Sequence, residues 1–192
     1  MNGILRSFFC IELPPAVQKK LWQTVDTLRL VLPDLKWVSA NALHITLKFL
    51  GEQEQRLLED LMRSFEKRIA SSGQDVIALS SSALGAFPNI RTARTLFAEL
   101  CGDLVPLKAI ASIVEDVSAE HGIPREKRPF KPHITLARTR RTETVIISPK
   151  DIPLFSKIEW QATSVTLMKS SLTPAGPIYT PLKIWEFPAK VF

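Results

Sequence analysis

Two copies of one tetrapeptide, His-Ile-Thr-Leu, contain two of the three histidines of this 192-residue chain. The first copy is His44–Leu47 and the second is His133–Leu136, nearly half the chain further on. Chance can place a threonine two positions after a histidine, but it rarely does so twice with the same Ile and Leu neighbours. We therefore interpret the pair as a functional motif that two related halves of the protein contribute.

Each copy has the alternation of a β-strand, in which successive side chains point to opposite faces. His44 and Thr46 then share one face, as do His133 and Thr135, while the Ile and Leu side chains enter the core. An ordinary strand with solvated polar side chains would explain this alternation, but it would not explain the identity of the copies. If the two halves pair symmetrically, both imidazoles and both hydroxyls line one cleft.

Two imidazoles that face one cleft are suited to concerted acid–base chemistry. Histidine has an unperturbed pKa of about 6.5, so around neutral pH one ring can act as a general base while the other acts as a general acid. Threonine hydroxyls donate hydrogen bonds to anionic oxygens. The set fits in-line displacement at phosphorus, with His44 and His133 as catalytic residues and Thr46 and Thr135 on the phosphate. The residues alone do not say which histidine is the acid.

Other uses of these residue types are disfavoured. Two imidazoles are too few to hold a metal ion, and neither motif contains an acidic residue or a cysteine. The chain has no Gly-x-Ser-x-Gly motif, and Cys10 and Cys101 lie in apolar runs without metal-site or catalytic spacing. We predict no metal, no cofactor and two small buried cysteines.

A basic stretch surrounds the second motif. It contains Arg125, Lys127, Arg128, Lys131, Arg138, Arg140 and Arg141, opposed only by Glu126. Most of these side chains are expected to be solvated surface, but Arg128 and Arg138 flank the motif closely enough to meet a phosphate. On the first strand, Lys48 is predicted to share the face of the motif's polar residues. Phe49 is expected to pack in the core, with stacking on a nucleobase as the alternative.

Composition is that of a globular protein, with 45% hydrophobic and 23% charged residues. The net charge of +6 and the pI of about 9.5 mildly favour a polyanionic partner. The first residues are apolar but interrupted by Arg6 and Glu12, no cleavage site follows, and no run is long enough to span a membrane. We expect one domain over residues 1–192, cytoplasmic and monomeric.

Hydrophobic spacing predicts helices over about 15–32, 53–71 and 105–121. Strands are predicted over 6–13, 43–51, 75–87, 94–101, 130–138, 144–148, 157–171 and 178–187. The late strands follow one another as hairpins do. This order favours an α+β fold with antiparallel sheets over a doubly wound parallel fold.

Four segments in order, NALHITLKFLG, GAFPN, KRPFKPHITLAR and SSLTPAGPIYTPL, resemble the RNA 2′,3′-cyclic phosphodiesterases of the 2H phosphoesterase superfamily, formerly called 2′-5′ RNA ligases. The similarity extends from the RSFFCIEL strand to the C-terminal region. The resemblance implies a bilobal α+β fold in which two antiparallel sheets with flanking helices are arranged with pseudo-twofold symmetry around a central cleft. Each lobe would contribute one His-x-Thr-x strand.

The resemblance also implies a reaction, the metal-independent hydrolysis of an RNA 2′,3′-cyclic phosphate end to a 2′-phosphomonoester, with weak reverse 2′-5′ ligation. By this similarity His44 donates a proton to the leaving 3′ oxygen and His133 activates water. Thr46 and Thr135 would bind the phosphate oxygens, and Arg138 would add charge there. The candidate RNA-binding residues are Arg128, Lys48, Phe49 and Tyr179. The implied partner is RNA with a cyclic phosphate end, tRNA fragments being one source, and no membrane is involved.

Two alternatives remain open. A phosphodiesterase of the same superfamily could act on 2′-5′ oligonucleotides, or on a small cyclic phosphate such as ADP-ribose cyclic phosphate. A protein of a different class, an RNA-end-binding module, would bind the cyclic end without turning it over.

Overall fold

The computed structural model describes residues 3–139, 144–148, 157–174 and 176–188. Within these ranges it contains the α-helices α1 (Pro15–Val31), α2 (Gln55–Ser71) and α3 (Leu104–Glu120), which lie close to the predicted helices. Arg140 and Arg141 of the basic stretch lie outside the described residues.

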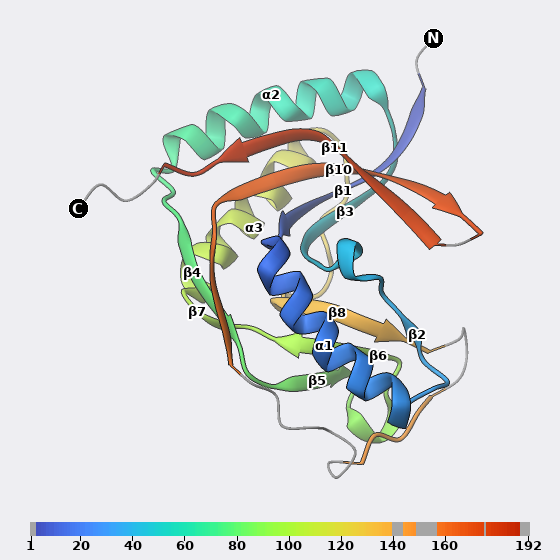
Figure 1. The fold of residues 1–192 in the computed structure, drawn as a ribbon. Helices are drawn as coiled ribbons and strands as arrows, with labels where there is room; N and C mark the ends of the chain where they lie inside the picture. Colours follow the sequence, from blue (N-terminus) through green and yellow to red (C-terminus); the bar gives the residue numbers. More distant parts are fainter. Residues whose placement is uncertain (1–2, 140–143, 149–156, 175, 189–192) are drawn as a thin grey trace.

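The strands of the described residues form two antiparallel sheets (Figure 1). The larger sheet has the order β11-β10-β1-β3-β8-β6-β5, and β2 also pairs with β8. Its strands are β1 (Ile4–Glu12), β2 (Lys36–Trp37), β3 (His44–Glu54), β5 (Leu84–Phe87), β6 (Thr95–Glu99), β8 (His133–Arg138), β10 (Ser164–Thr173) and β11 (Gly176–Glu186). The smaller sheet contains β7 (Cys101–Gly102), β4 (Ile77–Ser81) and β9 (Ile158–Ala162) in that order. The predicted α+β class with antiparallel sheets is confirmed.

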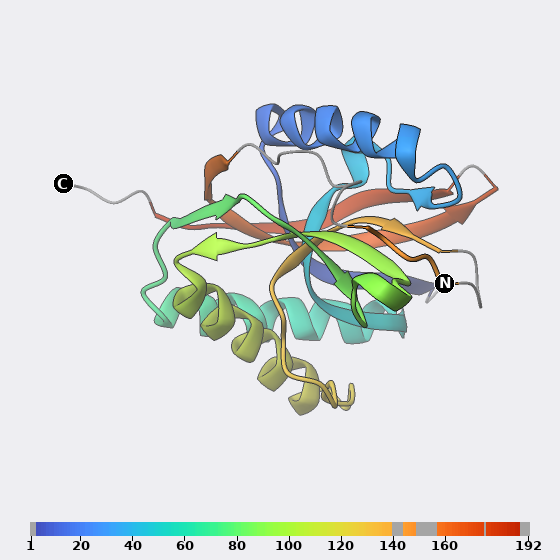
Figure 2. The same ribbon diagram turned by 90° about the horizontal axis from the view of Figure 1, so that it is seen from below.

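Helices cover both sides of the sheets, with α1 on one side and α2 and α3 on the other (Figure 2). Each helix turns toward the strands a stripe of buried residues spaced three or four apart, as an amphipathic helix does. The stripes include Val17, Leu21 and Val25 in α1, Leu61, Phe65 and Ile69 in α2, and Leu107, Ile110 and Val114 in α3. They pack with Ile45 and Ile134 of β3 and β8 in one hydrophobic core. Residues of all three helices therefore contribute to the core that holds the motif strands.

Four strand predictions differ from the structure. The run 75–87 divides into β4 of the smaller sheet and β5 of the larger one, and Cys101, at the end of the run 94–101, belongs to β7 and not to β6. The segment 144–148 forms only an isolated bridge, between Val145 and Ala93. The run 157–171 was expected as one strand, but it divides at Thr163 into β9 of the smaller sheet and β10 of the larger one. Both halves alternate with a period of two, and this pattern does not reveal which sheet each half joins.

The two motif strands carry the same irregularity. The pairing of β3 with β1 skips Leu47, and the pairing of β8 with β6 skips Leu136. Each leucine is the extra residue of a β-bulge, which changes the face that the following side chains occupy. Lys48 and Ala137 are consequently buried, whereas Phe49 and Arg138 are exposed at equivalent positions of the two strands.

The predicted placement of Lys48 beside the motif's polar residues is wrong, because the bulge turns this side chain into the core. The Lys48 side chain is 1% exposed, and its Nζ lies 2.8 Å from Oε2 of Glu115 on α3. It also donates a hydrogen bond to the carbonyl oxygen of Pro124 at 2.9 Å. The same Glu115 oxygen accepts a hydrogen bond from the backbone N–H of Glu126 at 3.2 Å. This buried network ties β3 to α3 and to the segment that leads into β8.

Loss of the Glu115 carboxylate should therefore destabilise the fold. Glu115→Leu leaves the Lys48 ammonium buried without its counter-ion, so we expect the free energy of unfolding to fall by about 3–5 kcal/mol. The double variant Lys48→Met/Glu115→Leu replaces the pair by apolar side chains and should recover most of this loss. Denaturant unfolding measures both. A Glu115→Leu protein as stable as the parent would contradict the role given to the pair.

Candidate active site

The structure brings the two motifs side by side. β3 and β8 are antiparallel neighbours, with Ile45 paired to Ile134. In an antiparallel pair this register sets Thr135 across from His44 and Thr46 across from His133. All four polar side chains therefore share one face of the sheet, opposite the two buried isoleucines. Below, this surface is called the motif face.

Both imidazoles are held in the same tautomer. Nδ1 of His44 lies 2.8 Å from the carbonyl oxygen of Ala42, and Nδ1 of His133 lies 2.7 Å from that of Lys131. A carbonyl oxygen can only accept, so each Nδ1 carries the hydrogen and Nε2 is left for chemistry. Nε2 of His44 lies 2.9 Å from Oγ1 of Thr46 on the same strand. The fixed rings thus each present a nitrogen that can accept or donate a proton.

Aromatic rings pack against both histidines. The ring centroid of His44 lies 4.9 Å from that of Phe8 and 5.3 Å from that of Tyr179. That of His133 lies 5.1 Å from Phe87 and 5.2 Å from Phe97. Sequence reasoning singled out Tyr179 but missed the roles of Phe8 and Phe97, which come from neighbouring strands. Only the strand pairing could have identified them, because both look like ordinary core residues.

Burial dominates the electrostatics of the site. It lowers the pKa of His44 to about 4, although the hydrogen bond to Ala42 opposes the shift and the charges of Arg138 and His133 add to it. Burial also lowers the pKa of His133 below its usual 6.5, against the hydrogen bond to Lys131 and with help from the charges of Arg138 and Lys131. Both rings are therefore neutral in the free protein at pH 7.

Arg138 supplies positive charge to both halves of the site. Its guanidinium donates a hydrogen bond from Nη1 to Oγ1 of Thr95 at 3.1 Å. Its charge lowers the pKa of His44 and of His133, and it acts against the rise that burial causes in the pKa of Tyr179. A cation felt by all three groups is well placed to attract an anion between the two imidazoles. Two imidazoles beside a guanidinium are chemically suited to acid–base work on an anionic centre.

The other candidate residues differ in their exposure and in their ion pairs. Phe49 is 51% exposed, so the expectation that it packs in the core is wrong. Arg128 is exposed on the segment between α3 and β8 and makes no ion pair with another described residue. Arg125, in contrast, is paired with Asp116 at 2.7 Å. Two residues of the basic stretch, Arg138 and Lys131, act on His133 through their charge. Lys131 also lies over the Phe87 and Phe97 rings.

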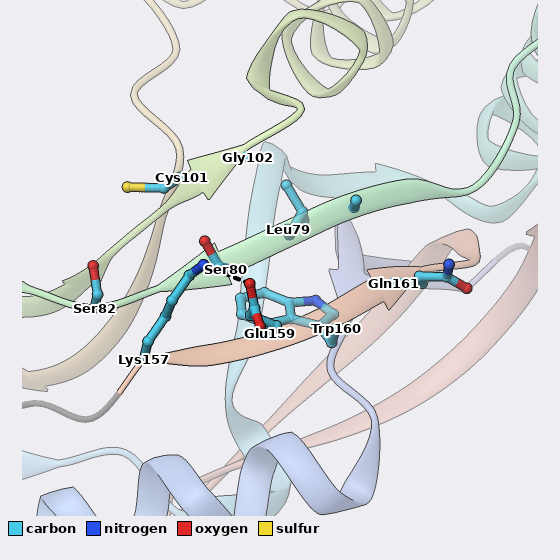
Figure 3. Close-up of a pocket in the computed structure, with 10 residues that line it drawn as sticks. Leu79, Ser80, Ser82, Cys101, Gly102, Lys157, Glu159, Trp160 and Gln161 are labelled. Atoms are coloured by element: carbon cyan, nitrogen blue, oxygen red, sulfur yellow. Dashed lines mark ion pairs between the residues drawn. The ribbon is translucent and has the colours of Figure 1, made fainter.

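Two hollows differ in their relation to the motifs. One of about 110 Å³ is bordered by His44, Tyr179 and the buried Cys10. Another, of about 620 Å³, lies on the smaller sheet beside the Lys157–Glu159 ion pair, and no motif residue lines it (Figure 3). Cys101 borders this second hollow and is exposed, so the prediction that both cysteines are buried fails for Cys101.

Across the described ranges, no three His, Cys, Asp or Glu side chains are grouped so that they could hold a metal ion together. In the same part of the chain, no helix has both the length and the apolar character needed to cross a membrane.

Known proteins resemble this chain over most of its length. The family model of the 2′-5′ RNA ligase superfamily matches residues 17–173. The RNA 2′,3′-cyclic phosphodiesterase of Thermus thermophilus is 34% identical over 185 residues, which cover 93% of this chain and 88% of the relative. The RNA 2′,3′-cyclic phosphodiesterase of Escherichia coli is 31% identical, with coverage of 96% and 98%. The chain belongs to the 2′-5′ RNA ligase superfamily.

Solved structures share the fold over nearly their whole length. Escherichia coli LigT complexed with 3′-AMP has a TM-score of 0.79 at 27% identity, covering 96% of this chain and 99% of that one. TT0787 of Thermus thermophilus has a TM-score of 0.74 at 27% identity, with coverage of 97% and 100%. The arrangement of the two motif strands is thus part of a fold found in solved phosphoesterase structures.

The depressed pKa values predict that anion binding takes up protons. An anion between the rings raises the pKa of each imidazole, and both are neutral in the free protein at pH 7. Affinity for sulfate, whose charge is constant in this range, should rise as the pH falls from about 8 toward 5, by up to about tenfold per unit for each proton bound. Calorimetric titration in buffers of different ionisation enthalpy measures this uptake.

The third histidine provides the matched control for that titration. His121 ends α3 and contacts Ser64 of α2. His121→Gln should keep the pH dependence of sulfate binding, whereas His44→Gln or His133→Gln should weaken it. Sulfate affinity that does not change with pH in the parent protein would contradict the coupling.

Proposed function

We propose that this protein hydrolyses the 2′,3′-cyclic phosphate end of RNA to a 2′-phosphomonoester. One observation carries the proposal: two imidazoles with fixed tautomers present Nε2 on one face of two adjacent strands, beside two threonines and Arg138. The relatives named RNA 2′,3′-cyclic phosphodiesterase support the choice of substrate. No step in the proposed reaction needs a group other than these side chains and water.

The residues that follow the two bulges differ, and this difference supports the roles proposed for the histidines. In-line displacement puts the attacking water and the leaving oxygen on opposite sides of the phosphorus. The leaving 3′ oxygen carries the nucleoside, and Phe49 gives the β3 side an exposed aromatic ring where the β8 side has Arg138. The nucleoside then lies over β3, so His44 protonates the 3′ oxygen and His133 takes the proton of the water.

In this reaction the bond from the water oxygen to phosphorus forms as the bond from phosphorus to the 3′ oxygen breaks. The proton of the water goes to Nε2 of His133, and the proton on Nε2 of His44 goes to the 3′ oxygen. Thr46, Thr135 and Arg138 bind the non-bridging oxygens, whose charge grows in the transition state. The 2′ oxygen keeps its phosphate, which gives the 2′-phosphomonoester. When the 5′ hydroxyl of a second RNA replaces water in this displacement, its oxygen bonds to phosphorus as the bond to the 3′ oxygen breaks, and the product is a 2′-5′ phosphodiester, which is weak ligation.

Protonation of His44 accompanies substrate binding in this proposal. Burial keeps the pKa of the free ring at about 4, so the empty site lacks its acid at neutral pH. The cyclic phosphate brings a negative charge next to the ring and offsets Arg138, and both effects raise the pKa of His44. The acid is therefore charged when a substrate anion is present.

Either histidine variant should lose most of its turnover. For His44→Ala and His133→Ala we expect kcat to fall by about 10²–10⁴-fold, because each removes one proton-transfer group. The substrate is an RNA ending in a 2′,3′-cyclic phosphate, and the product is identified as a 2′- or 3′-phosphate. His121→Ala is the control and should keep parental turnover, as should the parent protein in EDTA. A turnover in either variant that equals that of the parent would end the two-histidine mechanism.

The same assay separates the alternatives. An RNA-end-binding module would bind the cyclic end without product formation by the parent protein. A related phosphodiesterase would prefer 2′-5′ linked oligonucleotides or ADP-ribose cyclic phosphate in a substrate panel. Formation of a 3′-phosphate product would contradict the assigned leaving group.

Phe49 and Arg138 should affect different parts of the substrate. Stacking of a base on an aromatic ring contributes about 1–3 kcal/mol, so Phe49→Ala should lower kcat/KM for a nucleoside 2′,3′-cyclic phosphate by about 5- to 100-fold. It should leave a base-free ribose 2,3-cyclic phosphate unaffected. Arg138→Gln should lower kcat/KM for both compounds. Equal effects of Phe49→Ala on the two compounds would show that the base does not lie on this ring.

A further inference from the structure

The end of the β10–β11 hairpin separates from the rest of the larger sheet beside the candidate site. β1 pairs with β10 only from Ser7 opposite Lys169 onward, and its residues before Ser7 pair with β3 instead. Ser170–Thr173 of β10 pair only with β11 among the described strands. The hairpin end therefore diverges from the start of β1 and projects beyond it (Figure 1).

The separated end continues the motif face outward. Tyr179, which packs against His44, is the register partner of Ser170. Two residues further along, Leu172 is paired with Pro177, and alternation puts both side chains on the face of Tyr179. Leu172 is 69% exposed and Pro177 is exposed. Leu172 and Pro177 therefore form an exposed apolar surface next to the aromatic rings that pack against His44.

Arg6 lies on the β1 side of this divergence. It is two residues before Phe8, whose ring packs on His44, and its side chain is exposed on the same face. The charge of Arg6 acts on Tyr179, lowering the pKa of a phenol that burial raises. Within the described chain, Arg6 has no acidic side chain at ion-pair distance. Its charge is available to a ligand.

The charges on β3 favour the hairpin side for an anionic chain. Glu52 and Glu54 are exposed on β3, opposite Arg6 and Ile4 in the register. Their negative charge repels a phosphodiester from the β3 side of Arg6, while the hairpin side offers Leu172 and Pro177 without an acidic neighbour in the pairing. An RNA strand that leaves the site would follow the hairpin.

We propose that Arg6, Leu172 and Pro177 form a subsite for the nucleotide immediately 5′ of the cyclic phosphate end. The inference rests on the proposed function, which puts the terminal nucleoside over β3, and on the position of Arg6 on the neighbouring strand β1. Arg6 then binds the phosphodiester that joins the last two nucleotides, and the penultimate base packs on Leu172 and Pro177. The protein would therefore recognise an RNA end and not only a mononucleotide.

Two substrates that share their last nucleotide test this subsite. They are adenosine 2′,3′-cyclic phosphate and a dinucleotide that ends in the same adenosine 2′,3′-cyclic phosphate. For the parent protein we expect kcat/KM to be about tenfold higher for the dinucleotide. Arg6→Gln and Leu172→Ser should each remove most of this gain, while their kcat/KM for the mononucleotide stays parental, which also reports that they are folded.

The salt dependence of kcat/KM and two control variants provide further tests of the subsite. Arg6→Gln should reduce the slope of log kcat/KM against log salt for the dinucleotide by about 0.7, the value for one phosphate contact on a single strand. Lys20→Gln and Leu30→Ser remove a similar charge and a similar exposed apolar side chain on α1, and should keep both the gain and the slope.

The outcomes separate the two proposals. If the parent protein hydrolyses neither compound, the proposed function fails and the subsite fails with it. If it hydrolyses both with equal kcat/KM, or if the gain persists in Arg6→Gln and Leu172→Ser, the hydrolytic function stands and the subsite is overturned.

Discussion

The structure depends on a short overlap between β3 and β8. Among the described residues their register has one pair, Ile45 with Ile134, and each strand begins at its histidine. Beyond that pair β2 occupies the edge of β8, while β3 continues alongside β1. The overlap holds the motif residues together and lets the two halves of the sheet diverge around them. A slip of one residue in this pairing would turn the polar side chains into the core, so the buried isoleucines select the register in which the site exists.

Two identical motifs cannot by themselves give two histidines different tasks. The bulges at Leu47 and Leu136 repeat the backbone geometry, and the side chains that follow break its symmetry. Phe49 offers a surface for a base where Arg138 offers charge. The same bulge buries Lys48 where the other strand has Ala137, and the buried ammonium needs Glu115 on α3 as its counter-ion. The bulges at Leu47 and Leu136 thus connect the asymmetry of the motif face to the asymmetry of the core behind it.

Much of this arrangement is predictable from the sequence, and the exceptions share a cause. The common face of His and Thr follows from strict alternation, and the helix ends lie within two residues of their predicted positions because apolar spacing and prolines mark them. A bulge leaves no such mark, since Leu47 is as apolar as any core residue and Lys48 has the polarity of a surface residue. Phe49 was assigned to the core by its type alone. Phe8 and Phe97 contact the histidines across pairs of strands. The local sequence pattern does not predict the register between distant strands, so these contacts could not be predicted.

The electrostatics of the motif face fit a site that is completed by its ligand. Three potentially cationic side chains, His44, His133 and Arg138, share one partly buried surface, and if all were charged they would repel one another without a counter-ion. Burial resolves this conflict by keeping both rings neutral, so of these three side chains only Arg138 is charged in the empty site. A bound phosphate reverses the balance, because it offsets Arg138 and stabilises an imidazolium at the same time. The free energy lost in burying the rings therefore favours binding of an anion, and in the proposed reaction the proton for the leaving oxygen is taken up together with the substrate.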